Sequence, residues 1–284
     1  MPTSIQIDAH HHFWQISRGD YDWMTDEVAD IRHDILPQDL APHLAKHGIT
    51  GTVVVQAAAS VAETEFLLGL AETCDFIKGV VGWVDLEATD APHVFDRLQT
   101  SPKLKGLRLT LQDIEKTDWI LSPAVGVNLA AMATRGLRLD ALIQPRHLQV
   151  MAQVARALPD LQIVVDHCAK PVISGGADAG DLWRSGMAQL AEQPNVWCKI
   201  SGLANEAGPE WSAAPLQPVV DHVVRHFGAD RLMWGSDWPV LNLVGDYAAW
   251  RGVSAQLLEG RSPSERDAIF GGTACKFYQL EAGQ

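Results

Sequence analysis

Eight short apolar runs alternate with helical patterns along the chain, and this alternation restricts the fold more than any other feature. Each run is rich in valine, isoleucine and leucine, as buried parallel strands are. Strands that alternate with helices pair in parallel, because each parallel return needs a crossover of a dozen or more residues. Eight such units in 284 residues predict an α/β fold, a single (β/α)₈ barrel of the TIM type. The expected strands are residues 4–9, 52–56, 79–85, 104–109, 137–143, 162–167, 196–201 and 232–237.

An open, doubly wound sheet is the alternative fold. Its first strand is commonly followed by a glycine-rich phosphate loop, and no such loop follows residues 4–9. We see no repeat, low-complexity tract or linker, so residues 1–284 are expected to form one domain. Helix signals agree with the alternation: Ser60 with Glu63 forms the pattern of a capping box, and Ser262-Pro263 with Glu265 opens a last helix.

Composition narrows the class of protein and of partner. A net charge of −13 argues against binding to nucleic acid or to an anionic membrane. No basic leader and no apolar run of membrane-spanning length is evident. The four cysteines lie far apart without a C-x-x-C pair, which is typical of reduced thiols. We therefore expect a soluble cytoplasmic protein that acts on a small molecule; its oligomeric state stays open.

The longest connections, residues 14–37, 170–181 and 202–215, follow strands rather than helices. In a barrel they emerge at the carboxyl end, where active sites lie. Chemically capable residues also stand at these strand ends. They are His10, His12, Arg108, Gln144, His167, Lys199 and Asp237.

Each of these residues, taken singly, has an ordinary structural explanation. Arg108 can pair with a surface acid, Lys199 can extend along apolar surface, and Asp237 can cap a helix. Their convergence from six strands onto one mouth favours an active site. In addition, His10 and His12 project from the same face of the first strand, where two imidazoles can hold one cation or one polarised carbonyl.

Four segments together resemble the metal-dependent-hydrolase-like branch of the amidohydrolase superfamily. The order of the motifs is kept from Ile5 to about Leu280, and within the branch the chain is similar to the group of L-fuconolactonase and L-rhamnonolactonase. This resemblance implies a (β/α)₈ barrel and hydrolysis of a lactone ring. The segments are Asp8-x-His10-x-His12-Phe13-Trp14, His167-Cys168-Ala169-Lys170-Pro171, Lys199-Ile200-Ser201-Gly202 and Trp234-Gly235-Ser236-Asp237-Trp238-Pro239.

The resemblance also implies a metal site made of His10, His12, His167 and Asp237. Neutral imidazoles with one carboxylate suit zinc or manganese. Binuclear relatives carry a carboxylated lysine or a bridging glutamate at the fourth strand, where this chain has Arg108 and Leu109. We therefore expect at most one divalent ion. Some lactonases of this branch hold it weakly or work without it.

For lactone opening, Asp237 is the expected general base and then acid. A metal on His10, His12 and His167 would supply the positive charge that stabilises the oxyanion. Without a metal, Arg108, Lys199 and the histidines are expected to stabilise it, and the fork of Arg108 suits the carboxylate of the product. Further residues are expected to touch the sugar, namely Trp14, Gln144, Lys170 and Trp238, with Trp23 and Trp83 as other possible walls.

The leading interpretation is thus an enzyme that opens a sugar lactone, such as L-fucono- or L-rhamnono-lactone, to the aldonic acid. The alternatives are a metal-dependent decarboxylase of the aminocarboxymuconate-semialdehyde type, a pyrone-dicarboxylate-type lactonase and a non-enzymatic barrel that binds a sugar acid. A dicarboxylate would demand several arginines at the mouth, and Arg108 alone is obvious, so a neutral lactone is preferred.

Overall fold

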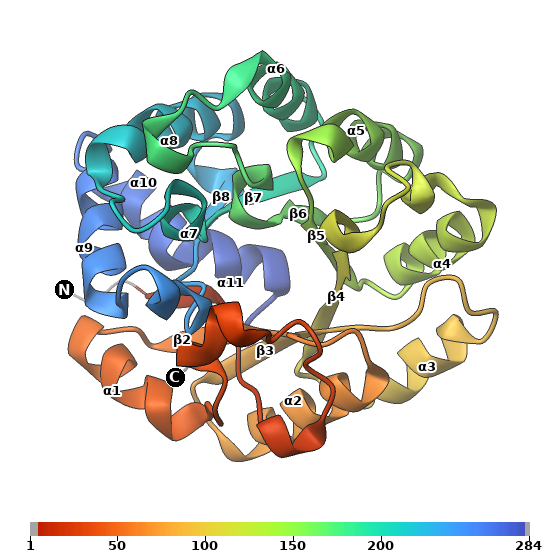
Figure 1. Ribbon diagram of the computed structural model, residues 1–284. Helices are drawn as coiled ribbons and strands as arrows, with labels where there is room; N and C mark the ends of the chain where they lie inside the picture. Colours follow the sequence, from red (N-terminus) through yellow and green to blue (C-terminus); the bar gives the residue numbers. More distant parts are fainter. Residues whose placement is uncertain (1–4, 282–284) are drawn as a thin grey trace.

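The computed structural model describes residues 5–281, and they form the expected barrel. Eight parallel strands lie in sequence order, each paired with the next (Figure 1). The strands are β1 (Ile7–His11), β2 (Gly51–Val55), β3 (Ile77–Gly82), β4 (Leu104–Thr110), β5 (Arg138–Leu142), β6 (Ile163–Val165), β7 (Val196–Ile200) and β8 (Leu232–Trp234).

Helices surround the strands, as the alternation of patterns predicted. They are α1 (Pro37–His47), α2 (Val61–Thr73), α3 (Ala91–Leu98), α4 (Pro123–Thr134), α5 (Leu148–Ala157), α6 (Gly180–Ala191), α7 (Leu203–Ala207), α8 (Ala213–Phe227), α9 (Tyr247–Leu257), α10 (Pro263–Asp267) and α11 (Thr273–Tyr278). The (β/α)₈ fold is confirmed. Ser4, at the start of the first expected strand, lies outside the described residues, and the single-domain assignment stays a prediction.

Backbone hydrogen bonds close the barrel between its first and last strands. The amide of Asp237 donates to the carbonyl of His10 at 2.8 Å, and the amide of His12 donates to the carbonyl of Trp238 at 2.8 Å. Because these bonds come from the segment after β8, closure of the barrel also fixes the motif that carries Asp237 beside the two histidines of β1.

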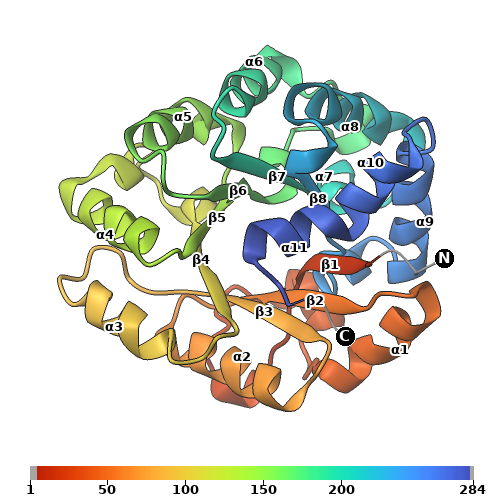
Figure 2. The same ribbon diagram turned by 180° about the vertical axis from the view of Figure 1, so that it is seen from behind.

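The two ends of the barrel differ in what covers them. Viewed from behind, α11 lies across the strands (Figure 2). Phe277 and Tyr278 of α11 pack with Ile7, Val53 and other strand residues in a buried apolar cluster. The helix thus covers the amino-terminal end and leaves the carboxyl end for the long connections. No helix among residues 5–281 is both long and apolar enough to cross a membrane.

The capping box expected for Ser60 with Glu63 is only half formed. Ser262 and Glu265 exchange both hydrogen bonds at the start of α10. Ser60 accepts from the amide of Glu63 and caps α2, but the carboxylate of Glu63 is turned away. It accepts instead from the amide of Ala57 at 3.1 Å and from the hydroxyl of Tyr21 at 2.8 Å. Glu63 therefore anchors the long connection after β1 to the barrel.

Glu63 should make stability depend on pH. Burial raises the pKa of Glu63 to about 7, although hydrogen bonds from Tyr21 and Ala57 oppose the shift. The folded chain then holds this proton more tightly than the unfolded chain, so the contribution of Glu63 to stability is full below pH 4.5 and is lost as pH rises to about 7. We expect the wild-type protein to lose roughly 2–3 kcal/mol over this range relative to Glu63→Gln. Urea unfolding of both proteins at several pH values checks this, and parallel pH curves would contradict it.

Candidate active site

A cavity of about 880 Å³ opens at the carboxyl end of the barrel. Its lining comes from the ends of most strands and from the connections that follow them. Residues from the strand ends include His12, Gln56, Arg108, Leu142, His167 and Asp237. The cavity thus lies at the end of the barrel where the site was expected.

His10 near the end of β1 and His12 just after it both approach Asp237, whereas His11 points away. His11 packs against Phe13 with ring centroids 4.7 Å apart, and burial lowers the pKa of His11 to about 3. The Nδ1 of His12 lies 2.7 Å from the carbonyl oxygen of Val55. A carbonyl only accepts, so Nδ1 carries the hydrogen of a neutral His12 and the lone pair of Nε2 faces the site.

His167 comes from a short left-handed turn that follows β6. Residues His167, Cys168, Ala169 and Lys170 all have φ between 49° and 59°. Such backbone is sparsely populated for residues other than glycine and is typical of functional sites. The turn brings Nδ1 of His167 to 2.8 Å from the hydroxyl of Ser201. A Cβ at the neighbouring Gly202 would lie 2.6 Å from this imidazole, so only glycine fits there.

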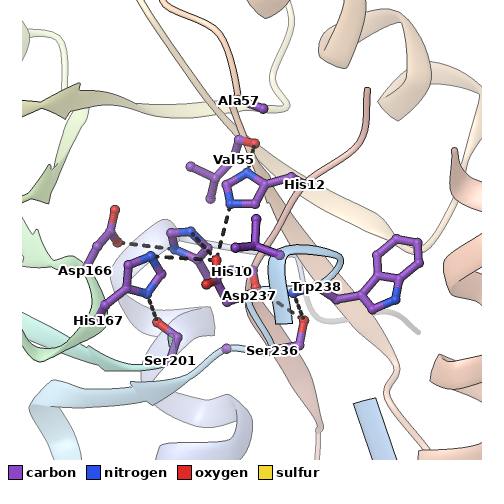
Figure 3. A network of polar contacts seen from close by, with 12 residues as sticks. His10, His12, Val55, Ala57, Asp166, His167, Ser201, Ser236, Asp237 and Trp238 are labelled. Atoms are coloured by element: carbon purple, nitrogen blue, oxygen red, sulfur yellow. Dashed lines mark hydrogen bonds and ion pairs between the residues drawn. The ribbon is translucent and has the colours of Figure 1, made fainter. Parts of the chain in front are cut away.

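Asp237 lies at the centre of three imidazoles (Figure 3). Its Oδ1 is 3.4 Å from Nε2 of His12 and 3.7 Å from Nε2 of both His10 and His167. Burial favours the neutral acid, but His167, His12 and His10 together lower the pKa of Asp237 well below its ordinary value. The carboxylate is therefore ionised at neutral pH and available to accept a proton or to bind a cation.

Asp8 of the first motif supports the positions of His10 and Asp237 through buried hydrogen bonds. Its carboxylate accepts from the amide of Ser236 at 2.8 Å, from the amide of His10 at 3.2 Å and from the hydroxyl of Tyr247 at 3.0 Å. Burial raises the pKa of Asp8 to about 6, against these hydrogen bonds. Asp8 thus ties the end of β1 to the turn that carries Asp237.

Three of the four expected metal ligands form a compact set. One ligand atom each from His10, His12 and Asp237 lie within 4.8 Å of one another. Nε2 of His10 is buried and has no hydrogen-bond partner among the described residues, which is the expected condition of a ligand atom. Two imidazoles and one carboxylate suit a zinc site with an open position. His167 lies beside this set, with its ring centroid 4.5 Å from that of His10, and its part as a ligand stays a prediction.

The structure places Lys199 beneath His10 and not on the cavity wall. Its ammonium is fully buried and lies 2.5 Å from Oδ2 of Asp140, 3.1 Å from Oδ1 of Asp166 and 3.1 Å from Nδ1 of His10. The expected role of Lys199 in oxyanion stabilisation assumed a side chain directed to the mouth. Instead, the two interior carboxylates hold it inside the barrel.

Arg108 and Lys170 do line the cavity. Arg108 is only 7% exposed, less open to solvent than its place at a strand end suggested, and its guanidinium donates to the carbonyl of Gln56. Burial lowers the pKa of Arg108, but a guanidinium remains charged. The ammonium of Lys170 donates to Gln112 at 3.0 Å and pairs with Glu206 at 3.1 Å.

Three residues that were expected to contact the substrate lie outside the lining of the cavity in the described chain, namely Trp14, Trp238 and Gln144. Trp14 is fully buried and donates to the carbonyl of His33 at 2.9 Å. Trp238 packs near Phe13 and His43, and Gln144 accepts from Arg146 at 3.2 Å. The aromatic walls are Trp23, Trp83 and Trp119.

Several lining residues were not predicted from the sequence. Asp85, Gln112 and Glu206 each belong to a segment that follows a strand, and this position was the available signal. Their residue types are common in surface loops, so the signal was weak without knowledge of which loops turn inward.

Comparison with known proteins agrees with the site. The family model described as Amidohydrolase matches residues 7–280. An L-fucono-1,5-lactonase of Burkholderia ambifaria is 44% identical, with 98% of this chain and 97% of that protein covered. An L-fucono-1,5-lactonase of Burkholderia multivorans is 34% identical at 98% and 97% coverage. A crystal structure of a Burkholderia multivorans amidohydrolase with bound zinc has a TM-score of 0.91 at 33% identity and covers 98% of this chain and 100% of that one. The chain therefore belongs to the amidohydrolase family.

Proposed function

We propose that this protein hydrolyses L-fucono-1,5-lactone, or a sugar lactone of closely similar structure, to the aldonic acid. Full-length similarity of 44% to an L-fucono-1,5-lactonase supports a sugar-lactone hydrolase. The observation that carries the chemistry is the ionised Asp237, ringed by three imidazoles at the floor of an 880 Å³ cavity. The same full-length similarity favours lactone hydrolysis over decarboxylation.

In the proposed reaction, Asp237 takes a proton from water as the water oxygen attacks the lactone carbonyl. Asp237 then returns the proton to the ring oxygen as the C–O bond of the tetrahedral intermediate breaks. We assign to Arg108 and His167 the stabilisation of the oxyanion, since both line the cavity with Asp237. A divalent ion held by His10, His12 and Asp237 would polarise the carbonyl oxygen as a Lewis acid.

The charge of the cavity supports a neutral substrate. Arg108 and Lys170 are the fixed cations among the described lining residues, and Lys170 already pairs with Glu206. A dicarboxylate would meet strong repulsion, whereas hydroxyl groups of a sugar can donate to the carboxylates. The lining carboxylates are Asp20, Asp22, Asp85, Glu87, Asp113, Glu206 and Asp237.

We further propose at most one divalent ion per chain, zinc or manganese, weakly held or dispensable. The compact ligand set and Arg108 at the fourth strand support one site rather than two. Elemental analysis of protein purified without chelator should find no more than one equivalent. Two tightly bound equivalents would contradict this.

Four free cysteines, two of them buried, support action in the cytoplasm.

Replacement of Arg108 tests the oxyanion assignment. Arg108→Met should lower kcat/KM at least roughly tenfold, about 1.4 kcal/mol of transition-state stabilisation. The melting temperature should change little, because methionine fills much of the same volume and one hydrogen bond to Gln56 is lost. Arg97→Met, at an exposed ion pair with Glu65, is the matched control. Intact activity with a large loss of melting temperature would identify Arg108 as a structural residue.

A pH-indicator assay with a panel of lactones tests the proposed substrate class. We expect acid release from L-fucono-1,5-lactone, slower release from sugar lactones of the opposite hand and none above background from 2-pyrone-4,6-dicarboxylate. Hydrolysis of the pyrone dicarboxylate alone would overturn the proposal.

A further inference from the structure

Three polar atoms meet in a buried triangle behind the candidate metal site. Nζ of Lys199 lies 3.1 Å from Nδ1 of His10 and 3.1 Å from Oδ1 of Asp166, and the last two atoms are 3.3 Å apart. All three side chains are fully buried, so no solvent competes for these contacts. Figure 3 marks the contact between Asp166 and His10 with a dashed line.

The triangle allows two arrangements of one hydrogen atom. In the first, Lys199 donates to Nδ1 of His10, and the hydrogen of the neutral imidazole is on Nε2. In the second, Nδ1 carries the hydrogen and donates to Asp166, which leaves the lone pair of Nε2 directed toward the site. Only the second arrangement makes Nε2 of His10 a metal ligand, and its carboxylate partner is the usual support of a ligating histidine.

The surroundings of Lys199 favour the first arrangement when no ion is bound. The ammonium of Lys199 is hydrogen-bonded to Oδ2 of Asp140 at 2.5 Å and to Nδ1 of His10, and it forms an ion pair with Oδ1 of Asp166. The hydroxyl of Tyr278 donates to the same oxygen of Asp140 at 2.7 Å and holds that carboxylate in place. Lys199 therefore cannot turn away from His10 without losing a partner.

We propose that Lys199 and Asp166 act in opposition as positioning residues, and that together they set the tautomer of His10 and so the affinity of the site for a divalent cation. Lys199 opposes binding because an ion must displace its hydrogen bond to His10. Asp166 supports binding because it accepts the hydrogen when that hydrogen moves to Nδ1. The inference rests on the proposed metal site, and it explains why the ion would be held weakly.

Two buried variants separate these roles. Lys199→Met with Asp140→Asn removes one positive and one negative charge, so the charge of the cluster is unchanged and Asp166 remains beside His10. Asp166→Asn replaces the charged carboxylate beside His10 with a neutral amide, which is a weaker acceptor, and leaves Lys199 with Asp140. Tyr278→Phe is the matched control, because it alters the same buried cluster without touching His10.

Zinc affinity is measured by competition with a chromogenic chelator, without any lactone. We expect at least tenfold tighter binding for the Lys199→Met, Asp140→Asn protein, at least tenfold weaker binding for Asp166→Asn, and a change within twofold for Tyr278→Phe. General damage to the cluster would weaken binding in both variants. A shift of both in the same direction, or no zinc binding by any of the proteins, would overturn the proposal.

Nitrogen-15 correlation spectra of the histidine rings give a second readout on the metal-free wild-type protein, which needs no buried variant to fold. We expect the hydrogen of His10 on Nε2, moving to Nδ1 when zinc is added. A hydrogen on Nδ1 in the metal-free protein would overturn the proposal. Because neither measurement uses a substrate, failure of the lactonase assignment would leave both results interpretable.

Discussion

Asp237→Asn should nearly abolish turnover while the protein stays folded and still binds lactone. Asparagine keeps the size of the side chain and most of its hydrogen bonds, but it cannot take a proton from water. Loss of general acid–base help costs roughly 10²- to 10⁴-fold in rate. The measurement is kcat of the purified variant, with circular dichroism for the fold. Binding is followed through the fluorescence of Trp23 and Trp83, which line the cavity.

An exposed aspartate provides the control for this substitution. Asp160→Asn, at a turn before β6, should leave kcat unchanged. If the Asp237→Asn protein is folded, binds lactone and turns it over within a few-fold of the parent, another residue is the base and the proposed mechanism is wrong.

Lys199→Met alone should destabilise the protein more than the substitutions at Glu63, Arg108 or Asp237. It leaves Asp140 and Asp166 buried without the ammonium that lies 2.5 and 3.1 Å from them. Removing one partner of a buried ion pair costs about 3–5 kcal/mol, because the remaining charge is uncompensated. Urea unfolding at pH 7 measures the loss.

Adding Asp140→Asn to Lys199→Met restores the charge balance of the cluster and should recover most of the lost stability. With Asp140→Asn added, one buried carboxylate remains near Lys199's position instead of two. We therefore expect the double variant to unfold at higher urea concentration than Lys199→Met. A single Lys199→Met variant as stable as the wild type would show that the cluster contributes nothing to the fold.

Features with a strict periodicity or a strict spacing were predictable from the sequence. Buried parallel strands alternate with helices in only a few ways, and eight units at this length predicted the barrel and its order. The H-x-H pair and Asp237 were predictable as neighbours, since the carboxyl ends of all strands meet at one mouth. His12, Arg108, His167, Lys170 and Asp237 accordingly line one cavity.

The direction of individual side chains was not predictable in the same way. Lys199 stands one residue before the end of β7, and whether it reached the mouth depended on Asp140 and Asp166, which come from other parts of the barrel. Trp14 follows the histidine motif directly, but its indole lies in the core. There it donates hydrogen bonds to carbonyls of the connection after β1. Such contacts between distant segments leave no local pattern in the sequence.

Opening of a sugar lactone at the site around Asp237 can be followed directly by carbon-13 NMR. L-fucono-1,5-lactone labelled at its carbonyl reports this reaction and separates it from decarboxylation. With catalytic amounts of the protein, the lactone signal should convert to the aldonate carboxylate well above the spontaneous rate, with no carbon dioxide formed. Conversion no faster than in buffer, by protein shown to be folded and supplied with zinc or manganese, would contradict the proposed activity.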